Sequence, residues 1–185
     1  MNSSGLSDFP PRRYTKSPLP AYRHVPGYSP HPINDVAGHS YRAVDELEEP
    51  RCMLSGVAWQ SCEPYLYGVD LFNLEFFWEA HENWEPLWHA AGHRSGPGLF
   101  IQGLIQVAAA FLLARADRPR AVPRMLERAE RNLHRAVAEN PAAFTAGEDP
   151  FGIALSPWLI SARLYLNAAL VGEHNQRFPF IELSL

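Results

Sequence analysis

Residues 77–93 read FWEAHENWEPLWHAAGH and hold three tryptophans, three histidines and three glutamates within seventeen residues. Carboxylates and imidazoles bind divalent cations and transfer protons, and aromatic rings exclude water from such groups. Ionisable groups in apolar surroundings must be paired, protonated or bound to a metal. The stretch therefore predicts either a metal or acid–base site or a buried hydrogen-bond network.

The stretch has the pattern of a helix whose ionisable side chains do not share the solvated face. At about 100° per residue, four residues lie on one arc bordered by indole rings. These four, His81, Glu82, Glu85 and His89, are called the ionisable stripe. The other side of the helix is expected to face water. Its residues are Glu79, Asn83, Pro86 and Ala90.

The spacing within the ionisable stripe suits a divalent cation. Glu85 is four residues from both His81 and His89, so these side chains can meet from successive turns. Zinc, manganese and iron accept such nitrogen and oxygen ligands. The sequence HENWE is similar to the HExxH helix of zinc peptidases, with Glu in place of the second His. We predict His81, Glu85 and His89 as metal ligands and Glu82 or Glu85 as the general base that activates water.

The N-terminal segment is predicted to be an extended arm. Eight of the seventeen prolines lie in the first fifty residues, which excludes a continuous helix there. Residues 22–41, YRHVPGYSPHPINDVAGHSY, add aromatic residues and three histidines, so we expect this part to lie against the folded body. Its His31 and His39 are predicted to complete the metal coordination. A solvated linker with incidental histidines is the alternative.

The next predicted helix carries two polar side chains, Gln102 and Gln106, in an otherwise apolar run. An amide both donates and accepts, so it can hold an imidazole or a carboxylate in place. We expect both glutamines to face the ionisable stripe and to support its ligands. Trp84 and Trp88 are expected to pack around the same groups.

The fold class predicted for the chain is all-α, as a single compact bundle of about five helices. Apolar periodicity and capping residues place helices from Ser61 through Phe72, from Asn73 to Gly92, over 98–116, over 122–139 and from Ser156 to near Gly172. The third is apolar nearly all round and is expected at the centre. The expected organisation is a Pro-rich arm over 1–50, partly packed on the body, a helical domain over 51–175 and a C-terminal tail over 176–185.

Composition excludes several classes of protein. Sixteen Lys and Arg against twenty Asp and Glu give a net charge of −4, which argues against nucleic acid and against an anionic membrane surface as partners. The composition does not exclude a small-molecule or peptide ligand, and it does not predict the oligomeric state. Cys52 and Cys62 lack a CxxC spacing and are predicted to be free thiols of a cytoplasmic protein.

Three segments, YLYGVDLFN, FFWEAHENWEPLW and FIQGLIQVAAA, resemble the bacterial and archaeal family known as domain of unknown function 309. The segments PGYSPHP and GHSY look like the arm of one branch of that family, and the resemblance covers roughly residues 22–140. It implies a small all-α fold. Family members are often described as predicted metal-dependent hydrolases, which implies a role for His81, Glu82 and Glu85, together with the two glutamines.

Two hypotheses follow from these residues. In the first, the protein is a metal-dependent hydrolase with its site on the ionisable stripe. In the second, it is a non-enzymatic helical binding or structural module. His81, Glu85, Gln102 and Gln106 then form a buried hydrogen-bond network.

Overall fold

The computed structural model describes residues 10, 12–41, 52, 54, 56–144 and 149–184. Its five α-helices are α1 (Glu63–Asn73), α2 (Phe77–Ala91), α3 (Gly96–Arg115), α4 (Val122–Glu139) and α5 (Leu155–Leu170). Over the described residues, extended pairing is limited to one isolated bridge between Ile153 and Leu183. The prediction of an all-α bundle of about five helices is confirmed.

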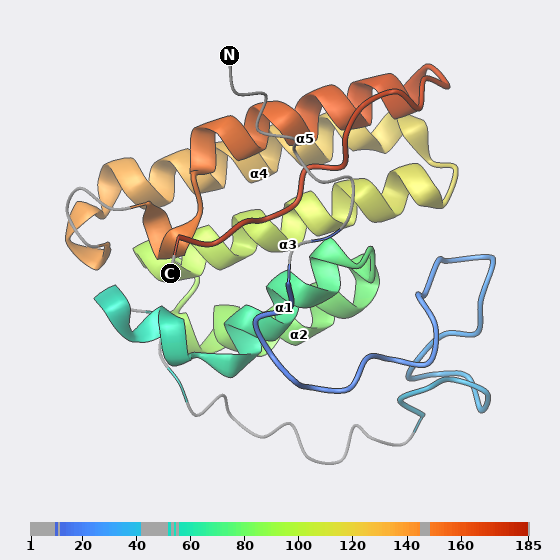
Figure 1. Ribbon diagram of the computed structural model, residues 1–185, viewed down its shortest axis with the longest axis horizontal. Coiled ribbons are helices and arrows are strands. Elements are labelled where there is room, and N and C mark those ends of the chain that lie inside the picture. Colours follow the sequence, from blue (N-terminus) through green and yellow to red (C-terminus); the bar gives the residue numbers. More distant parts are fainter. Residues whose placement is uncertain are drawn as a thin grey trace.

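The core helix is α3, which lies between α2 and α4 (Figure 1). It is apolar on all sides, and most of its residues are buried. Its length and hydropathy would also suit a membrane span. The packing of α2 and α4 on different sides of α3 accounts for the same apolar composition. The predicted central position of α3 is confirmed.

Two glycines allow neighbouring helices to approach closely. At Gly103 of α3, a side chain would collide with Leu133 of α4. At Gly68 of α1, a side chain would collide with the indole of Trp84, which is fully buried on α2. The Trp84 indole N–H also donates to the Tyr65 carbonyl oxygen at 3.2 Å. Trp84 therefore fixes α1 against α2 and acts as a packing residue.

The outer helix α4 has the bounds that the periodicity predicts for it. Its buried residues recur at three-four spacing and face inward; they are Val122, Leu126, Ala129, Leu133 and Ala136. The following helix, α5, begins at Leu155, ahead of the predicted cap Ser156.

Two predicted helix caps are wrong because the side chains bind elsewhere. Ser61 lies in the 3-10 helix η2 (Gly56–Ser61), and its hydroxyl donates to the Ala58 carbonyl oxygen at 3.1 Å. Asn73 ends α1 instead of capping α2. Its amide donates to the Ile181 carbonyl oxygen at 2.9 Å and accepts from the Ile181 N–H at 2.7 Å. The long-range contact with Ile181 therefore occupies the Asn73 side chain, although the local sequence favours a helix cap at this position.

The prediction of two free thiols is also wrong, because Cys52 and Cys62 form a disulfide. Their Cα atoms lie 5.4 Å apart, which is an ordinary separation for a disulfide. The intervening helix η2 packs the chain back on the bundle through the buried Trp59. The ten-residue separation of the two cysteines in the sequence does not show that η2 brings them together.

Residues 12–41 of the arm run along α1 and α2 (Figure 1). The buried Asp70 of α1 accepts hydrogen bonds from the N–H groups of Tyr14 at 2.7 Å and Thr15 at 2.9 Å. It accepts a third from the Thr15 hydroxyl at 2.7 Å, and the Arg13 guanidinium lies 3.6 Å away. These donors fix this end of the arm on the body. The other residues of the predicted arm, 1–9, 11 and 42–50, lie outside the described residues.

The C-terminal segment is also packed on the bundle. Ile181 is fully buried, and the Phe178 ring lies against aromatic rings of four helices, α1, α2, α3 and α5. The Tyr14 hydroxyl accepts a hydrogen bond from the Leu183 N–H at 2.8 Å, so the arm and the tail are in contact.

Candidate functional site

Three members of the ionisable stripe come together on α2. His81, Glu82 and Glu85, here called the open cluster, each offer one ligand atom, and these atoms lie within 4.8 Å of one another. The His81 Nδ1 and Glu82 Oε1 atoms are 3.2 Å apart, and both side chains are 33% exposed. Ligands at about 2.1 Å from a tetrahedral metal lie roughly 3.4 Å from each other. Small side-chain rotations would therefore let all three residues bind one cation.

His89, the fourth member of the stripe, makes a different contact. Its Nδ1 lies 3.1 Å from the Nε2 of His93, one turn further along the chain. The Trp88 ring stacks on His93 with ring centroids 4.1 Å apart. His89 is exposed and is not among the three residues whose ligand atoms converge.

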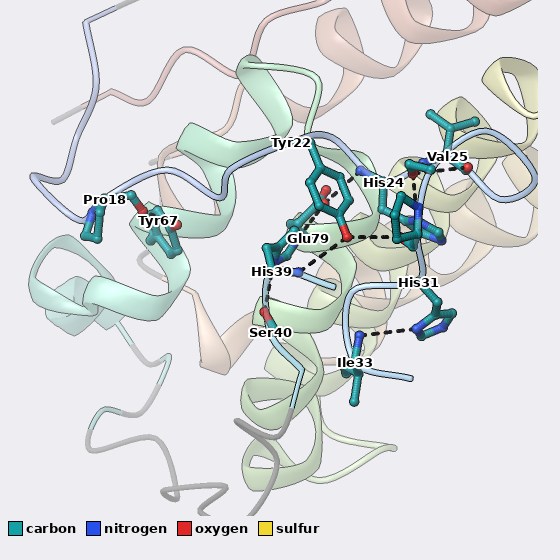
Figure 2. Close-up of polar contacts among 12 residues, drawn as sticks. Pro18, Tyr22, His24, Val25, His31, Ile33, His39, Ser40, Tyr67 and Glu79 are labelled. Carbon is teal, nitrogen blue, oxygen red and sulfur yellow. Dashed lines mark hydrogen bonds and ion pairs between the residues drawn. The ribbon is translucent and has the colours of Figure 1, made fainter. Parts of the chain in front are cut away.

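The arm histidines reach α2, but they contact Trp78 and Glu79. The His39 Nε2 lies 3.2 Å from the Glu79 Oε1, and the backbone N–H of His24 donates to the same oxygen at 2.8 Å. The rings of His24 and His31 meet the Trp78 indole edge-on, at 5.4 and 5.5 Å between centroids. Figure 2 shows His24 and His39 converging on Glu79. This group of five residues is called the covered cluster.

The expectation that Glu79 faces water is wrong. Only 5% of the residue is exposed, because the arm lies over that side of α2. Burial raises the pKa of the Glu79 carboxyl, and hydrogen bonds from the His24 N–H and the His39 ring oppose part of the rise. The Glu79 Oε2 atom has no hydrogen-bond partner among the described residues. A helical projection cannot identify this residue, since the arm that buries it is remote in sequence.

The environment of His24 disfavours its protonated form. Burial lowers the pKa of the His24 imidazole, and the neighbouring imidazoles of His31 and His39 add to this effect. The Ser29 hydroxyl lies 3.0 Å from the His24 Nδ1. A neutral His24 is therefore the form that fits the covered cluster.

A hollow of about 560 Å³ lies between the arm and α1–α2. Its lining includes Pro18, Tyr67, Trp78, Glu79 and Glu82. At its edge the Tyr67 hydroxyl donates to the Pro18 carbonyl oxygen at 2.6 Å (Figure 2). Glu82 belongs both to this lining and to the open cluster, so the hollow adjoins the three potential metal ligands.

The two glutamines do not support the ionisable stripe in the way we expected. The Asn132 amide of α4 donates to the side-chain oxygens of Gln102 and Gln106, each at 3.0 Å. This corrects the expected direction of the glutamines: their oxygens face α4 because an amide on that helix lies within reach of both. Their position links α3 to α4.

Asp70 and Asn73 are polar residues whose roles the sequence did not suggest. Both are buried, and they fix the arm and the tail respectively. In the sequence, these two residues stand out only as an acid and an amide within the apolar run YLYGVDLFN. Buried polar groups require partners, but the sequence does not say which segments supply them.

Residues 65–125 match the model of a family described as Domain of unknown function (DUF309). The predicted family resemblance is confirmed over this segment, which runs from α1 to the first residues of α4 and contains the open cluster. It includes Asp70 and Glu79 but not the arm. No curated protein matches the chain.

Proposed function

We propose that this protein with a DUF309 domain binds a divalent cation at His81, Glu82 and Glu85 and is a metal-dependent hydrolase. The observation that carries the proposal is the convergence of one ligand atom from each residue within 4.8 Å. One imidazole and two carboxylates suit zinc, manganese or iron. The partial exposure of His81 and Glu82 leaves room for water and for a substrate.

The residues of the open cluster have separable roles in this proposal. A bound divalent cation would supply Lewis acidity and an acidified water molecule. His81 and Glu85, one helical turn apart, hold the cation. Glu82 lines the hollow and accepts the proton of the attacking water, because its carboxylate lies where the cluster and the hollow meet.

A non-enzymatic binding module is the second candidate, and the hollow is the observation that favours it. The buried network expected from the sequence for this candidate would join His81 and Glu85 to Gln102 and Gln106. The glutamine oxygens instead accept from Asn132, and His81 is one-third exposed. The module would therefore use the hollow as a ligand site without metal chemistry.

Metal binding is tested on protein purified without chelators and without a nickel column. We expect zinc, manganese or iron to raise the melting temperature of the wild-type protein and to be retained after gel filtration. His81→Ala and Glu85→Gln should lose this gain, since each removes one of the two residues that hold the cation. His134→Ala removes an exposed histidine of α4 and is the matched control. A wild-type protein that neither retains nor responds to these metals contradicts the proposal.

Hydrolysis is tested on the metal-loaded protein with a panel of ester, amide and phosphoester substrates. Glu82→Gln should abolish turnover while the metal stays bound, because it removes the base and leaves His81 and Glu85. Turnover that survives Glu82→Gln contradicts the role of Glu82 as the base, and the absence of turnover throughout the panel favours the binding module.

A further inference from the structure

The lining of the hollow includes a carboxylate that the proposed metal site does not use. Glu79 lines the hollow, is 5% exposed and has one oxygen without a partner among the described residues. A buried acceptor without a hydrogen-bond partner costs free energy, and a charged acceptor costs more. A ligand that brings a positively charged donor would recover this free energy.

The neighbouring groups contact only one oxygen of the Glu79 carboxyl group. The Ser40 hydroxyl lies 2.9 Å from the His39 Nδ1, and the His39 Nε2 lies 3.2 Å from the Glu79 Oε1. With Ser40 donating to Nδ1, the Nε2–H of His39 donates to Oε1. Oε1 then accepts from the His24 N–H and the His39 ring, while Oε2 has no partner among the described residues.

The charge around the hollow favours a cation. Its acidic residues are Glu79 and Glu82, three residues apart on α2. Neither lysine nor arginine occurs among the described residues that line it. The guanidinium of Arg13, which belongs to the same arm, lies 3.6 Å from the carboxylate of Asp70.

The rest of the lining suits an organic molecule rather than a bare metal ion. Trp78 and Tyr67 supply aromatic rings, and prolines of the arm supply apolar surface. An indole face attracts ammonium groups, while a divalent metal requires several converging nitrogen or oxygen ligands. Glu79 is not among the residues whose ligand atoms converge in the open cluster. The volume of about 560 Å³ lies within the range of small-molecule sites.

We propose that the hollow binds a small organic cation, in which a primary ammonium group is attached to a short apolar body. The ammonium lies between the carboxylates of Glu79 and Glu82, and the body lies against Trp78 and the arm. The Glu79 Oε1 keeps its contacts with the His24 N–H and the His39 ring, and the ammonium donates to Oε2. This site goes beyond the proposed hydrolase and needs no bound metal.

The test uses the full chain, stripped of metal with EDTA and dialysed, and measures binding by calorimetry at neutral pH. The probes are benzylammonium, the neutral benzyl alcohol and the anionic benzoate, which share one apolar body. Benzylammonium should bind at least about tenfold more tightly than benzyl alcohol, a difference of about 1.4 kcal/mol. Benzoate should not bind detectably.

Two variants locate the site. Glu79→Gln keeps the shape and an acceptor for the His24 N–H and should weaken benzylammonium binding by about tenfold. Glu82→Gln alters a more exposed residue and should weaken it to a smaller extent. Glu173→Gln is the matched control at an exposed position after α5 and should leave binding unchanged.

Each measurement either supports or overturns the proposed cation site. Equal affinity for benzylammonium and benzyl alcohol overturns it, as does unchanged binding in both glutamine variants. If Glu79→Gln fails to fold, as judged by circular dichroism, the Glu82→Gln variant and the three probes on the wild-type protein still decide. A failure of the metal proposal would not alter these measurements, since they are made without metal.

Discussion

The same residue types occupy opposite environments on two adjoining parts of α2. In the covered cluster, Glu79 is 5% exposed and is contacted by the backbone of His24 and the ring of His39. In the open cluster, the side chains of His81 and Glu82 are 33% exposed. The difference arises from the arm, which lies over one side of the helix and not the other. An acid and a histidine on a helix therefore do not define a site until the covering segment is known.

The largest effect should come from removing the anchor of the arm. Asp70→Ala leaves the N–H groups of Tyr14 and Thr15 without their acceptor, and we expect a loss of about 3 kcal/mol in the free energy of unfolding. Urea denaturation measures this, with the exposed Asp149→Ala as control, expected within about 0.5 kcal/mol. If the two variants lose the same stability, Asp70 is not an anchor.

The second-largest effect is a difference in the free energy of unfolding between variants of one glutamate from each cluster. Glu79→Ala leaves the buried N–H of His24 without its acceptor and should cost about 2 kcal/mol. Glu85→Ala, measured without metal, should stay within about 0.5 kcal/mol, because its side chain is only partly buried. Equal losses in the two variants would remove the distinction between the covered and the open cluster.

The smallest effect is a pH dependence that belongs to the covered cluster. Burial raises the folded-state pKa of Glu79 above its ordinary value of 4.5. The protonated form of Glu79 therefore stabilises the folded state. This contribution is fully present below pH 4.5 and is lost as pH rises through the folded-state pKa. The difference in melting temperature between Glu79→Gln and wild type should therefore shift in favour of the variant as pH rises from 4.5 through the folded-state pKa of Glu79. Glu85→Gln is the control, and an equal rise in that variant would contradict the assignment to Glu79.

Much of the fold could be predicted because it follows from local patterns. The three-four spacing of apolar residues specifies α4 with its observed bounds, and the all-round apolar run specifies the central helix α3. The caps at Ser61 and Asn73 were predicted wrongly because local capping was outweighed by contacts with Ala58 and Ile181. A capping hydrogen bond contributes about 1 kcal/mol, so another contact of similar strength can replace it.

The candidate site was predictable only in part. The convergence of His81 and Glu85 follows from the helical repeat, which places residues four apart on one side. The exposure of His89 and the pairing of both glutamines with Asn132 depend on which helices pack beside α2 and α3. The burial of Glu79 depends on His24 and His39, about forty to fifty-five residues earlier in the chain.

The sequence by itself determined the helices, their apolar faces and the concentration of acids and imidazoles on α2, because these depend on spacing within a few turns. Only the tertiary structure decided which of those groups are covered, which remain open and where the glutamines point. It also decided that Cys52 and Cys62 are joined. The physical reason is that burial and pairing depend on chain segments brought together in space, and a helical repeat carries no information about a distant arm.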